Sequence, residues 1–206
     1  MDKMKLVTIA NLKGGVGKTT TTIYLSALAS RTKIASIIDA DSQASASEWV
    51  DELGRHHGDI TLEVFEAPST RLLTRMISEA RELPNDGFVF IDTPPGSPEL
   101  AYLAMQNSDC VVVPTRAGLL EVPRVALTLR LVPEGTPTGI VITAANARTN
   151  AFQETAEAWR ESENLLGHIR ARTALTAAFS LDENALEDYE PIWNAIRALC
   201  YSNDVI

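Results

Sequence analysis

Hydrophobic and polar positions divide the chain into two kinds of segment. Short, continuous aliphatic runs are typical of strands buried on both faces of a parallel sheet, and longer segments between them space their apolar residues as helices do. The expected strands are Lys5–Ala10, Ile34–Asp39, Leu62–Phe65, Phe88–Asp92, Cys110–Pro114, Gly139–Thr143 and His168–Ile169. The expected helices are Thr19–Ser30, Ala44–Leu53, Thr70–Arg81, Pro98–Asn107, Leu120–Leu131, Ala151–Asn164 and Asn184–Cys200.

This alternation predicts an α/β fold, a doubly wound, mostly parallel sheet with helices on both faces. The loops after the strands' carboxyl ends then share one edge of the sheet, so motifs in these loops converge. A chain of 206 residues is long enough for one well-cored domain. Because no repeat, low-complexity tract or linker divides it, we expect a single domain over residues 1–206.

Composition narrows the class of protein. Hydrophobic residues make up 45% of the chain and charged residues 22%, and no apolar run approaches the roughly 18 residues of a membrane span. The chain shows no secretory signal, and Cys110 and Cys200 are isolated, so we expect reduced thiols in a cytoplasmic protein. The net charge of −9 excludes a uniformly basic surface and leaves only local patches for nucleic acid.

The strongest chemical signal is the segment NLKGGVGKTTTT at 11–22, between the first expected strand and helix. Its glycines let the backbone turn tightly and point N–H groups at phosphate oxygens, beside a helix N-terminus. Lys18 reaches the β- and γ-phosphates, and the Thr19 hydroxyl can bind Mg²⁺. The alternative is a glycine-rich turn with two solvated lysines, but the strand–loop–helix context favours a nucleoside triphosphate. The predicted phosphate-binding residues are Gly14, Gly15, Val16, Gly17, Lys18, Thr19 and Thr20.

Carboxylates follow two of the other expected strands. Asp39 and Asp41 end the second strand and project the same way if strand geometry continues, where they can serve a cation or a water. The alternative is a helix N-cap with a spare acid. Asp92 closes the fourth strand, the Walker B arrangement, which holds Mg²⁺ beside a phosphate-binding loop. The predicted metal ligands are therefore Thr19, Asp39 and Asp92.

The run KGGVGKTT, with a lysine at each end, resembles the deviant Walker A box of the ParA/MinD group of P-loop ATPases. The resemblance implies an ATP-bound sandwich homodimer in which Lys13 crosses the interface to touch the partner's phosphates. It also implies that Asp41 orients the attacking water and that Asp39 lies near the Mg²⁺ shell. Lys13, Lys18 and Asp41 are thus the predicted catalytic residues. The chain departs from the family pattern at Ser42, where proline is usual.

Within that group, the short layout resembles the small plasmid-type ParA proteins (ParF-like), which segregate DNA. This implies slow intrinsic ATP hydrolysis, ATP-dependent binding of DNA without sequence preference, and release by a ParB-like centromere-binding partner. The protein would then be nucleoid-associated when ATP-bound. The resemblance places DNA-binding residues in the C-terminal half, where the candidates are Arg148, Arg160, Arg170 and Arg172. Alternatively, these arginines pair with acids on solvated helix faces.

Two other functions stay open. One is a MinD-like cell-division or cargo-positioning ATPase that acts on a membrane or a protein scaffold. The final residues 200–206 are not a basic amphipathic helix, so we expect no membrane partner. The other is a metabolic P-loop ligase or kinase, which needs a second-substrate pocket that no extra polar cluster in the sequence indicates.

Overall fold

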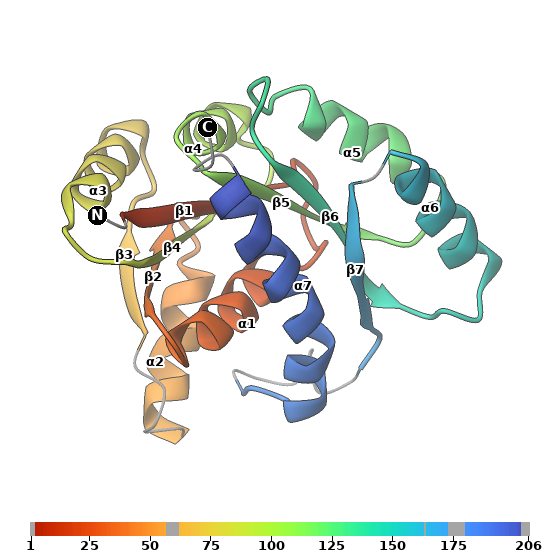
Figure 1. Cartoon of the computed structure of the whole chain (residues 1–206), viewed down its shortest axis with the longest axis horizontal. Coiled ribbons are helices and arrows are strands. Elements are labelled where there is room, and N and C mark those ends of the chain that lie inside the picture. The colour runs from red at the N-terminus through yellow and green to blue at the C-terminus, as the bar shows by residue number, and fades with distance from the viewer. Residues whose placement is uncertain (1–2, 57–61, 163, 173–179, 203–206) are drawn as a thin grey trace.

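The computed structural model describes residues 3–56, 62–162, 164–172 and 180–202 (Figure 1). Within them seven strands form one sheet in the order β3-β2-β4-β1-β5-β6-β7. The strands are β1 Met4–Ile9, β2 Ile34–Asp39, β3 Glu63–Glu66, β4 Gly87–Asp92, β5 Cys110–Arg116, β6 Thr138–Ala145 and β7 Leu165–Arg170. The helices are α1 Lys18–Ser30, α2 Ser45–His56, α3 Thr70–Glu82, α4 Pro98–Gln106, α5 Val122–Leu129, α6 Asn150–Glu161 and α7 Glu183–Tyr201.

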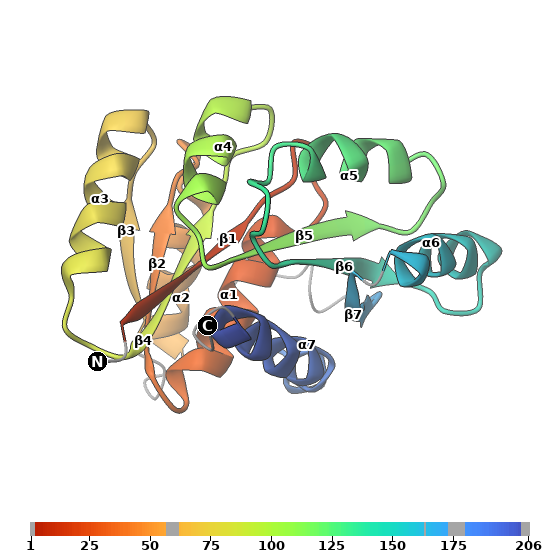
Figure 2. The same cartoon turned by 45° about the horizontal axis from the view of Figure 1, so that its top comes forward.

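The predicted α/β architecture is confirmed, and the sheet is more regular than expected because all six neighbouring strand pairs are parallel. Helices cover both faces (Figure 2). On β1, Val7 and Ile9 belong to the core beneath α1, α2 and α7, whereas Leu6 belongs to the core beneath α3 and α4. Successive side chains of a strand point to opposite faces, so a continuous apolar strand supplies both cores.

Several predicted bounds differ from those observed by one to three residues, and two of these differences have a clear physical cause. The last strand was expected at His168–Ile169 but spans Leu165–Arg170. It is an edge strand in which only Ile169 is fully buried, so it lacks the continuous apolar run that marks the inner strands. The fifth helix was expected to start at Leu120 but starts at Val122, because the apolar residues before it lie in an exposed loop. Residue 163, in the predicted sixth helix, lies outside the described residues.

Helix α1 is buried along most of its length and is held by α7, which lies over it (Figure 1). The rings of Tyr24 on α1 and Tyr189 on α7 stack with centroids 5.0 Å apart. The Thr21 hydroxyl hydrogen-bonds to the Tyr189 hydroxyl at 3.0 Å, so a polar group in this core keeps a partner. These contacts fix the start of α1, where the predicted phosphate loop ends.

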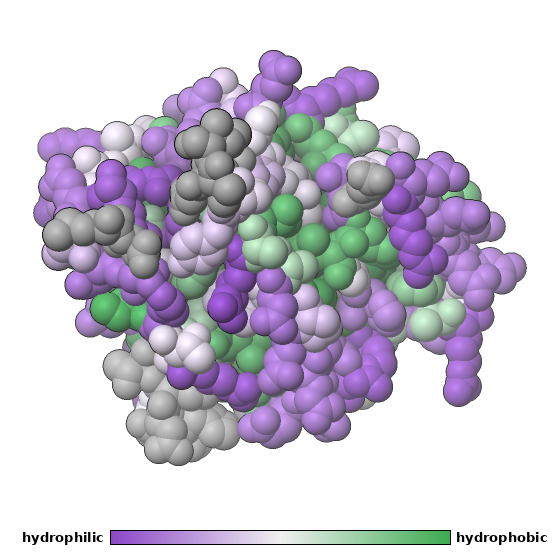
Figure 3. Space-filling model, viewed as in Figure 1, coloured by the Kyte–Doolittle hydropathy of each residue, from purple (hydrophilic) through white to green (hydrophobic). Residues whose placement is uncertain are grey.

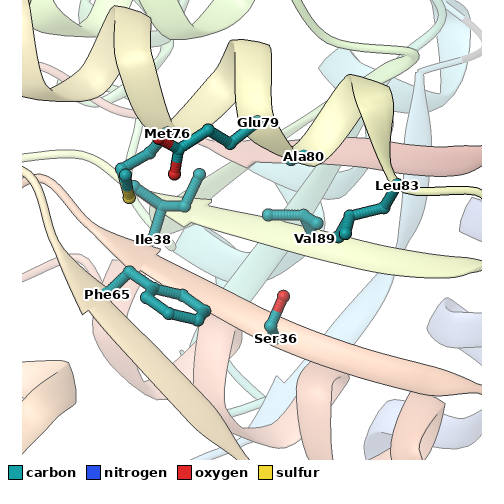
Figure 4. Close-up of a pocket in the computed structure, with 8 residues that line it drawn as sticks. All are labelled: Ser36, Ile38, Phe65, Met76, Glu79, Ala80, Leu83 and Val89. Carbon is teal, nitrogen blue, oxygen red and sulfur yellow. The ribbon is translucent and has the colours of Figure 1, made fainter.

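An open pocket with mostly apolar walls lies beneath α3. A cavity of about 170 Å³ lies between α3 and strands β2, β3 and β4, with Ile38, Phe65, Met76 and Val89 among its lining side chains (Figure 4). Its walls are almost entirely apolar, and none of the residues predicted for the phosphate or metal site lines it. The cavity therefore belongs to the packing of this face and not to the predicted chemistry.

The face seen in Figure 1 is mainly hydrophilic, with hydrophobic residues gathered beside α7 toward β6 and β7 (Figure 3). No helix in the described parts of the chain is long and apolar enough to cross a membrane. Cys200 lies in α7, whereas residues 203–206 of the predicted non-amphipathic C-terminus lie outside the described residues. Cys110 and Cys200 are both free and buried.

Candidate nucleotide site

The glycine-rich loop joins β1 to α1 at the carboxyl edge of the sheet, where β1 lies between β4 and β5. Gly15 and Gly17 have φ angles of +71° and +88°, in the left-handed region that other residues avoid. A Cβ on Gly17 would also come 3.3 Å from Thr143 on β6. Glycine at position 17 therefore satisfies a backbone requirement and a close approach together.

Three polar contacts that the sequence did not indicate hold the loop in place. The buried Asn11 side chain donates to the Pro114 carbonyl at 2.8 Å, and its oxygen accepts from the Lys13 N–H at 2.9 Å. The Thr143 hydroxyl donates to the Val16 carbonyl at 2.7 Å. Val16, one of the predicted phosphate-binding residues, is buried. It therefore contributes its backbone groups to the loop and its side chain to the core. Pro114 lies on β5 and Thr143 on β6, so the tertiary structure brings two of these three anchors to the loop.

Lys18, Thr19 and Asp92 meet where the loop enters α1. The Thr19 hydroxyl donates to the Asp92 carboxylate at 2.7 Å, and the Lys18 ammonium donates to the Lys13 carbonyl at 3.0 Å. Burial raises the pKa of Asp92 to about 7, although the Thr19 hydrogen bond and the Lys18 charge oppose the shift. Burial also lowers the pKa of Lys18, against the nearby charges of Asp92 and Asp41. The site thus brings a buried acid and a buried lysine together at the start of α1.

The two acids after β2 separate, which corrects the expectation that they project the same way. The strand ends at Asp39, whose carboxylate accepts from the Asp41 N–H at 3.0 Å and from the N–H groups of Ala46 and Ser47 at 3.0 and 3.3 Å. Burial raises the pKa of Asp39, and the three N–H groups oppose that shift. Asp39 therefore caps the start of α2, which is the alternative considered for this pair, and its place beside the metal stays a prediction. Only Asp41 lines the phosphate pocket.

Two adjoining pockets open at this edge. One, of about 430 Å³, is lined by Gly14, Gly15, Gly17, Lys18, Thr19, Thr20, Asp41, Ser45, Glu48, Trp49, Pro95 and Arg116. The other, of about 110 Å³, is lined by Gly17, Thr20, Arg116, Thr143, Ala144, Ile169, Arg172 and Tyr189. The first is polar and contains most of the predicted phosphate residues. The second shares Gly17, Thr20 and Arg116 with it and has the position and partly apolar walls expected of a nucleoside site.

The residues at the first pocket fit a triphosphate with Mg²⁺. The loop N–H groups and Lys18 can donate to phosphate oxygens, and Thr19 and Asp92 present the oxygen ligands that Mg²⁺ prefers. No group of three or more His, Cys, Asp or Glu residues in the described parts of the chain could hold a metal by itself. Phosphate oxygens and water would complete the shell, as is usual for Mg²⁺.

The Lys13 side chain forms an ion pair within its own chain. Its ammonium lies 2.5 Å from Glu121 Oε1, and its side chain is 34% exposed. Glu121 follows β5 and is the residue directly before α5. The sequence alone gave no reason to pair these residues, which are 108 positions apart.

The four candidate DNA-binding arginines do not form one patch. Arg170 and Arg172 both bind Asp188 on α7, at 2.6 and 3.1 Å. Burial acts to raise the pKa of Asp188, but the two arginines hold it below its ordinary value. Arg148 precedes α6 and Arg160 lies in its last turn, so most of the length of α6, about 15 Å, separates them. Arg148, Arg170 and Arg172 lie at the carboxyl edge of the sheet, because Ala145 at the end of β6 pairs with Arg170. Arg160 does not lie at this edge.

The position of the loop, at the strand where the sheet order reverses, is the usual place for a ligand in doubly wound sheets. Together with the lysine at its head, this defines the chain as a P-loop nucleotide-binding protein of the deviant Walker A type. A profile of the VirC1 protein family matches residues 4–150. The chain belongs to this family, within the ParA-like P-loop ATPases, so the predicted resemblance is confirmed.

Individual relatives agree with this placement. Maintenance of carboxysome distribution protein A from Gloeobacter kilaueensis is 32% identical over 148 residues, which cover 70% of this chain and 65% of that protein. Protein virC1 from Rhizobium rhizogenes is 33% identical over 133 residues, which cover 64% of this chain and 57% of that protein. The matches thus span less than two thirds of these relatives' own lengths.

A likeness in structure extends over nearly the whole chain. The crystal structure of a putative plasmid partition protein from Borrelia burgdorferi bound to AMPPNP has a TM-score of 0.78 to this chain. It is 22% identical in sequence, and the superposition covers 99% of this chain and 100% of that one. At this level of identity the likeness shows the shared fold.

Proposed function

We propose that this chain is an ATP-switched DNA-partition protein. It binds ATP with Mg²⁺, forms a sandwich homodimer that holds DNA without sequence preference, and is released when a ParB-like partner stimulates its slow hydrolysis. The observation that carries the proposal is the polar pocket that unites Lys18, Thr19 and Asp41 beside Lys13. The family membership and the structural likeness to a plasmid partition protein support it.

The chemistry proposed for the pocket is positioning and charge neutralisation. Lys18 and the loop N–H groups hold the β- and γ-phosphates, and Thr19 and Asp92 are placed to bind the magnesium. The bound metal would supply further neutralisation of the phosphate charge. Asp41, half-buried on the wall of the same pocket, is placed to orient a water toward the γ-phosphate.

Exposed apolar residues next to the Lys13–Glu121 ion pair support a dimer. Leu119 and Leu120 are 57% and 84% exposed, directly before Glu121, which binds Lys13. Neighbouring leucines that are this exposed, beside an ion pair, are typical of a protein contact. A second copy would cover them while its own loop approaches Lys13.

The second candidate is cargo positioning on a protein scaffold, as the 32% identity to a carboxysome distribution protein favours. It uses the same switch but needs no basic surface, which agrees with the net charge of −9. A small-molecule ligase would differ from both, because its ATP turnover would depend on an added acid.

The deciding experiment uses Asp41→Ala to trap the ATP state. Mass in solution is measured with ATP, with ADP and without nucleotide, and binding to a non-specific duplex is followed by fluorescence anisotropy at rising salt. We expect a dimer only with ATP and DNA binding only by that dimer, with a steep salt dependence. Lys18→Ala is the control, which should neither dimerise nor bind.

Each outcome of this experiment favours one of the candidate functions. An ATP-dependent dimer that ignores DNA would contradict partition and favour a protein scaffold; added vesicles and small acids test the membrane and ligase alternatives. A chain that binds ATP yet stays monomeric at every concentration would contradict the switch itself.

A further inference from the structure

We propose that Glu121 and Arg124 form a switch that keeps Lys13 within its own subunit until a second copy docks. The inference rests on the proposed function, because it concerns how the ATP-bound dimer forms. It starts from one contact, the ion pair between the Lys13 ammonium and Glu121 Oε1 at 2.5 Å. A lysine held in this way cannot at the same time reach a partner's phosphates.

The pair is costly to open without a replacement. The Glu121 side chain is only 12% exposed, and within the described chain its second oxygen, Oε2, is buried without a hydrogen-bond partner. If Lys13 left, the largely desolvated carboxylate would keep only its longer contact to Arg124, which is unfavourable unless that contact shortens. Dimerisation therefore has to compensate for the loss of this contact.

Arg124 is the replacement. Its guanidinium lies 3.7 Å from the same Oε1 atom, one helical turn beyond Glu121, and its side chain is 56% exposed. Residues three apart on a helix face each other, so a small change of rotamer closes this distance. Two cations thus compete for one carboxylate, and Arg124 can take it over when Lys13 leaves.

The loop that carries Glu121 is fixed, so Lys13 is the group that moves. Arg116 donates from Nε to the Gly15 carbonyl at 3.2 Å, which ties the end of β5 to the phosphate loop. Gly118 donates its N–H to the Thr155 hydroxyl at 2.9 Å, which ties the loop to α6. Glu121 therefore stays in place as Lys13 swings out.

The test is the dissociation constant of the ATP-bound dimer, measured by analytical ultracentrifugation with the full chain in the Asp41→Ala background. Glu121→Gln removes the charge that retains Lys13, and we expect about 3- to 10-fold tighter dimerisation. Arg124→Ala removes the replacement cation, and we expect dimerisation to weaken by a similar factor. Arg130→Ala, an exposed arginine just beyond α5, is the matched control and should change nothing.

A double-mutant cycle separates this switch from a merely structural role. With Lys13→Gln present, the effect of Glu121→Gln should vanish, because the carboxylate then has nothing to retain. The affinity of each monomer for a fluorescent ATP analogue, and its melting temperature, verify that the variants are folded.

The outcomes separate the two proposals. A parent protein that dimerises with ATP, but in which Glu121→Gln leaves the dimer unchanged or weaker, overturns the switch and leaves the proposed function intact. A parent that binds ATP and stays monomeric overturns the proposed function, and the switch with it.

Discussion

At the scale of single residues, Asp39, Asp41 and Asp92 all lie at or just after the end of an apolar strand, but their surroundings differ. Asp39 accepts hydrogen bonds from N–H groups at the start of α2, and Asp41 is half-buried at the phosphate pocket. Asp92 is fully buried against the hydroxyls of Thr19 and Thr22. The sequence shows three acids at strand ends, and only their hydrogen bonds distinguish a cap from a candidate water-orienting group and a candidate metal ligand.

The pKa of Asp92 predicts how the nucleotide-free protein responds to pH. The folded value of about 7 lies above the ordinary 3.8, so between these pH values the folded chain binds more protons than the unfolded chain. Stability contributed by this group should therefore fall as pH rises from about 4 to about 7. Asp92→Asn should remove that fall and stabilise the nucleotide-free protein at pH 8 by about 1–3 kcal/mol.

Urea unfolding at pH 5.5 and 8 measures the effect. Glu99→Gln, at an exposed acid in the first turn of α4, is the control and should leave the pH dependence unchanged. An Asp92→Asn protein with the parent's pH dependence would contradict the burial of an uncompensated carboxylate.

At the scale of elements, the phosphate loop is a backbone feature. Gly17 combines a positive φ angle with a tight contact to Thr143. Gly17→Ala should lower the free energy of unfolding by about 1–2 kcal/mol and abolish ATP binding, because the strain displaces the loop. Calorimetric titration with ATP and thermal melting measure the two effects.

The matched control is Gly54→Ala. Gly54 lies exposed within α2, where a Cβ meets open space. Alanine should stabilise that helix by about 0.5–1 kcal/mol and leave ATP binding unchanged. Equal effects at both glycines would show that the loop's conformation is not the cause.

The same scale shows what the pattern could predict. The inner strands and α1 were predicted almost to the residue, because two-faced burial produces unbroken apolar runs. The edge strand β7 and the start of α5 were misjudged, because their residues are half-buried or lie in an exposed loop. The loop glycines and Lys18 follow from spacing, whereas Asn11, Thr143 and Glu121 depend on β5 and β6 lying next to β1.

At the scale of the whole molecule, a net charge of −9 means that any DNA surface is local. Arg148 and Arg160 are both exposed, but only Arg148 lies at the carboxyl edge with the phosphate loop. If the ATP-bound dimer binds DNA at this edge, Arg148→Glu should weaken binding by about tenfold at low salt and flatten the salt dependence. Arg160→Glu, at the other end of α6, should have little effect.

Anisotropy with the trapped ATP state compares the two variants directly. Equal losses would indicate that charge acts through the whole surface and not through this edge. A loss confined to Arg160→Glu would place the DNA at the other end of α6.

The sequence by itself determined the layers of the fold, the phosphate loop and the family, because these depend on local periodicity, glycine geometry and fixed spacing. The tertiary structure decided the rest. In it, Asp39 caps the start of α2. Arg170 and Arg172 form ion pairs with Asp188, and Lys13 forms one with Glu121. The two members of each pair lie on separate elements or are separated by a turn. Which carboxylate binds which cation or amide therefore depends on how the sheet and its helices pack.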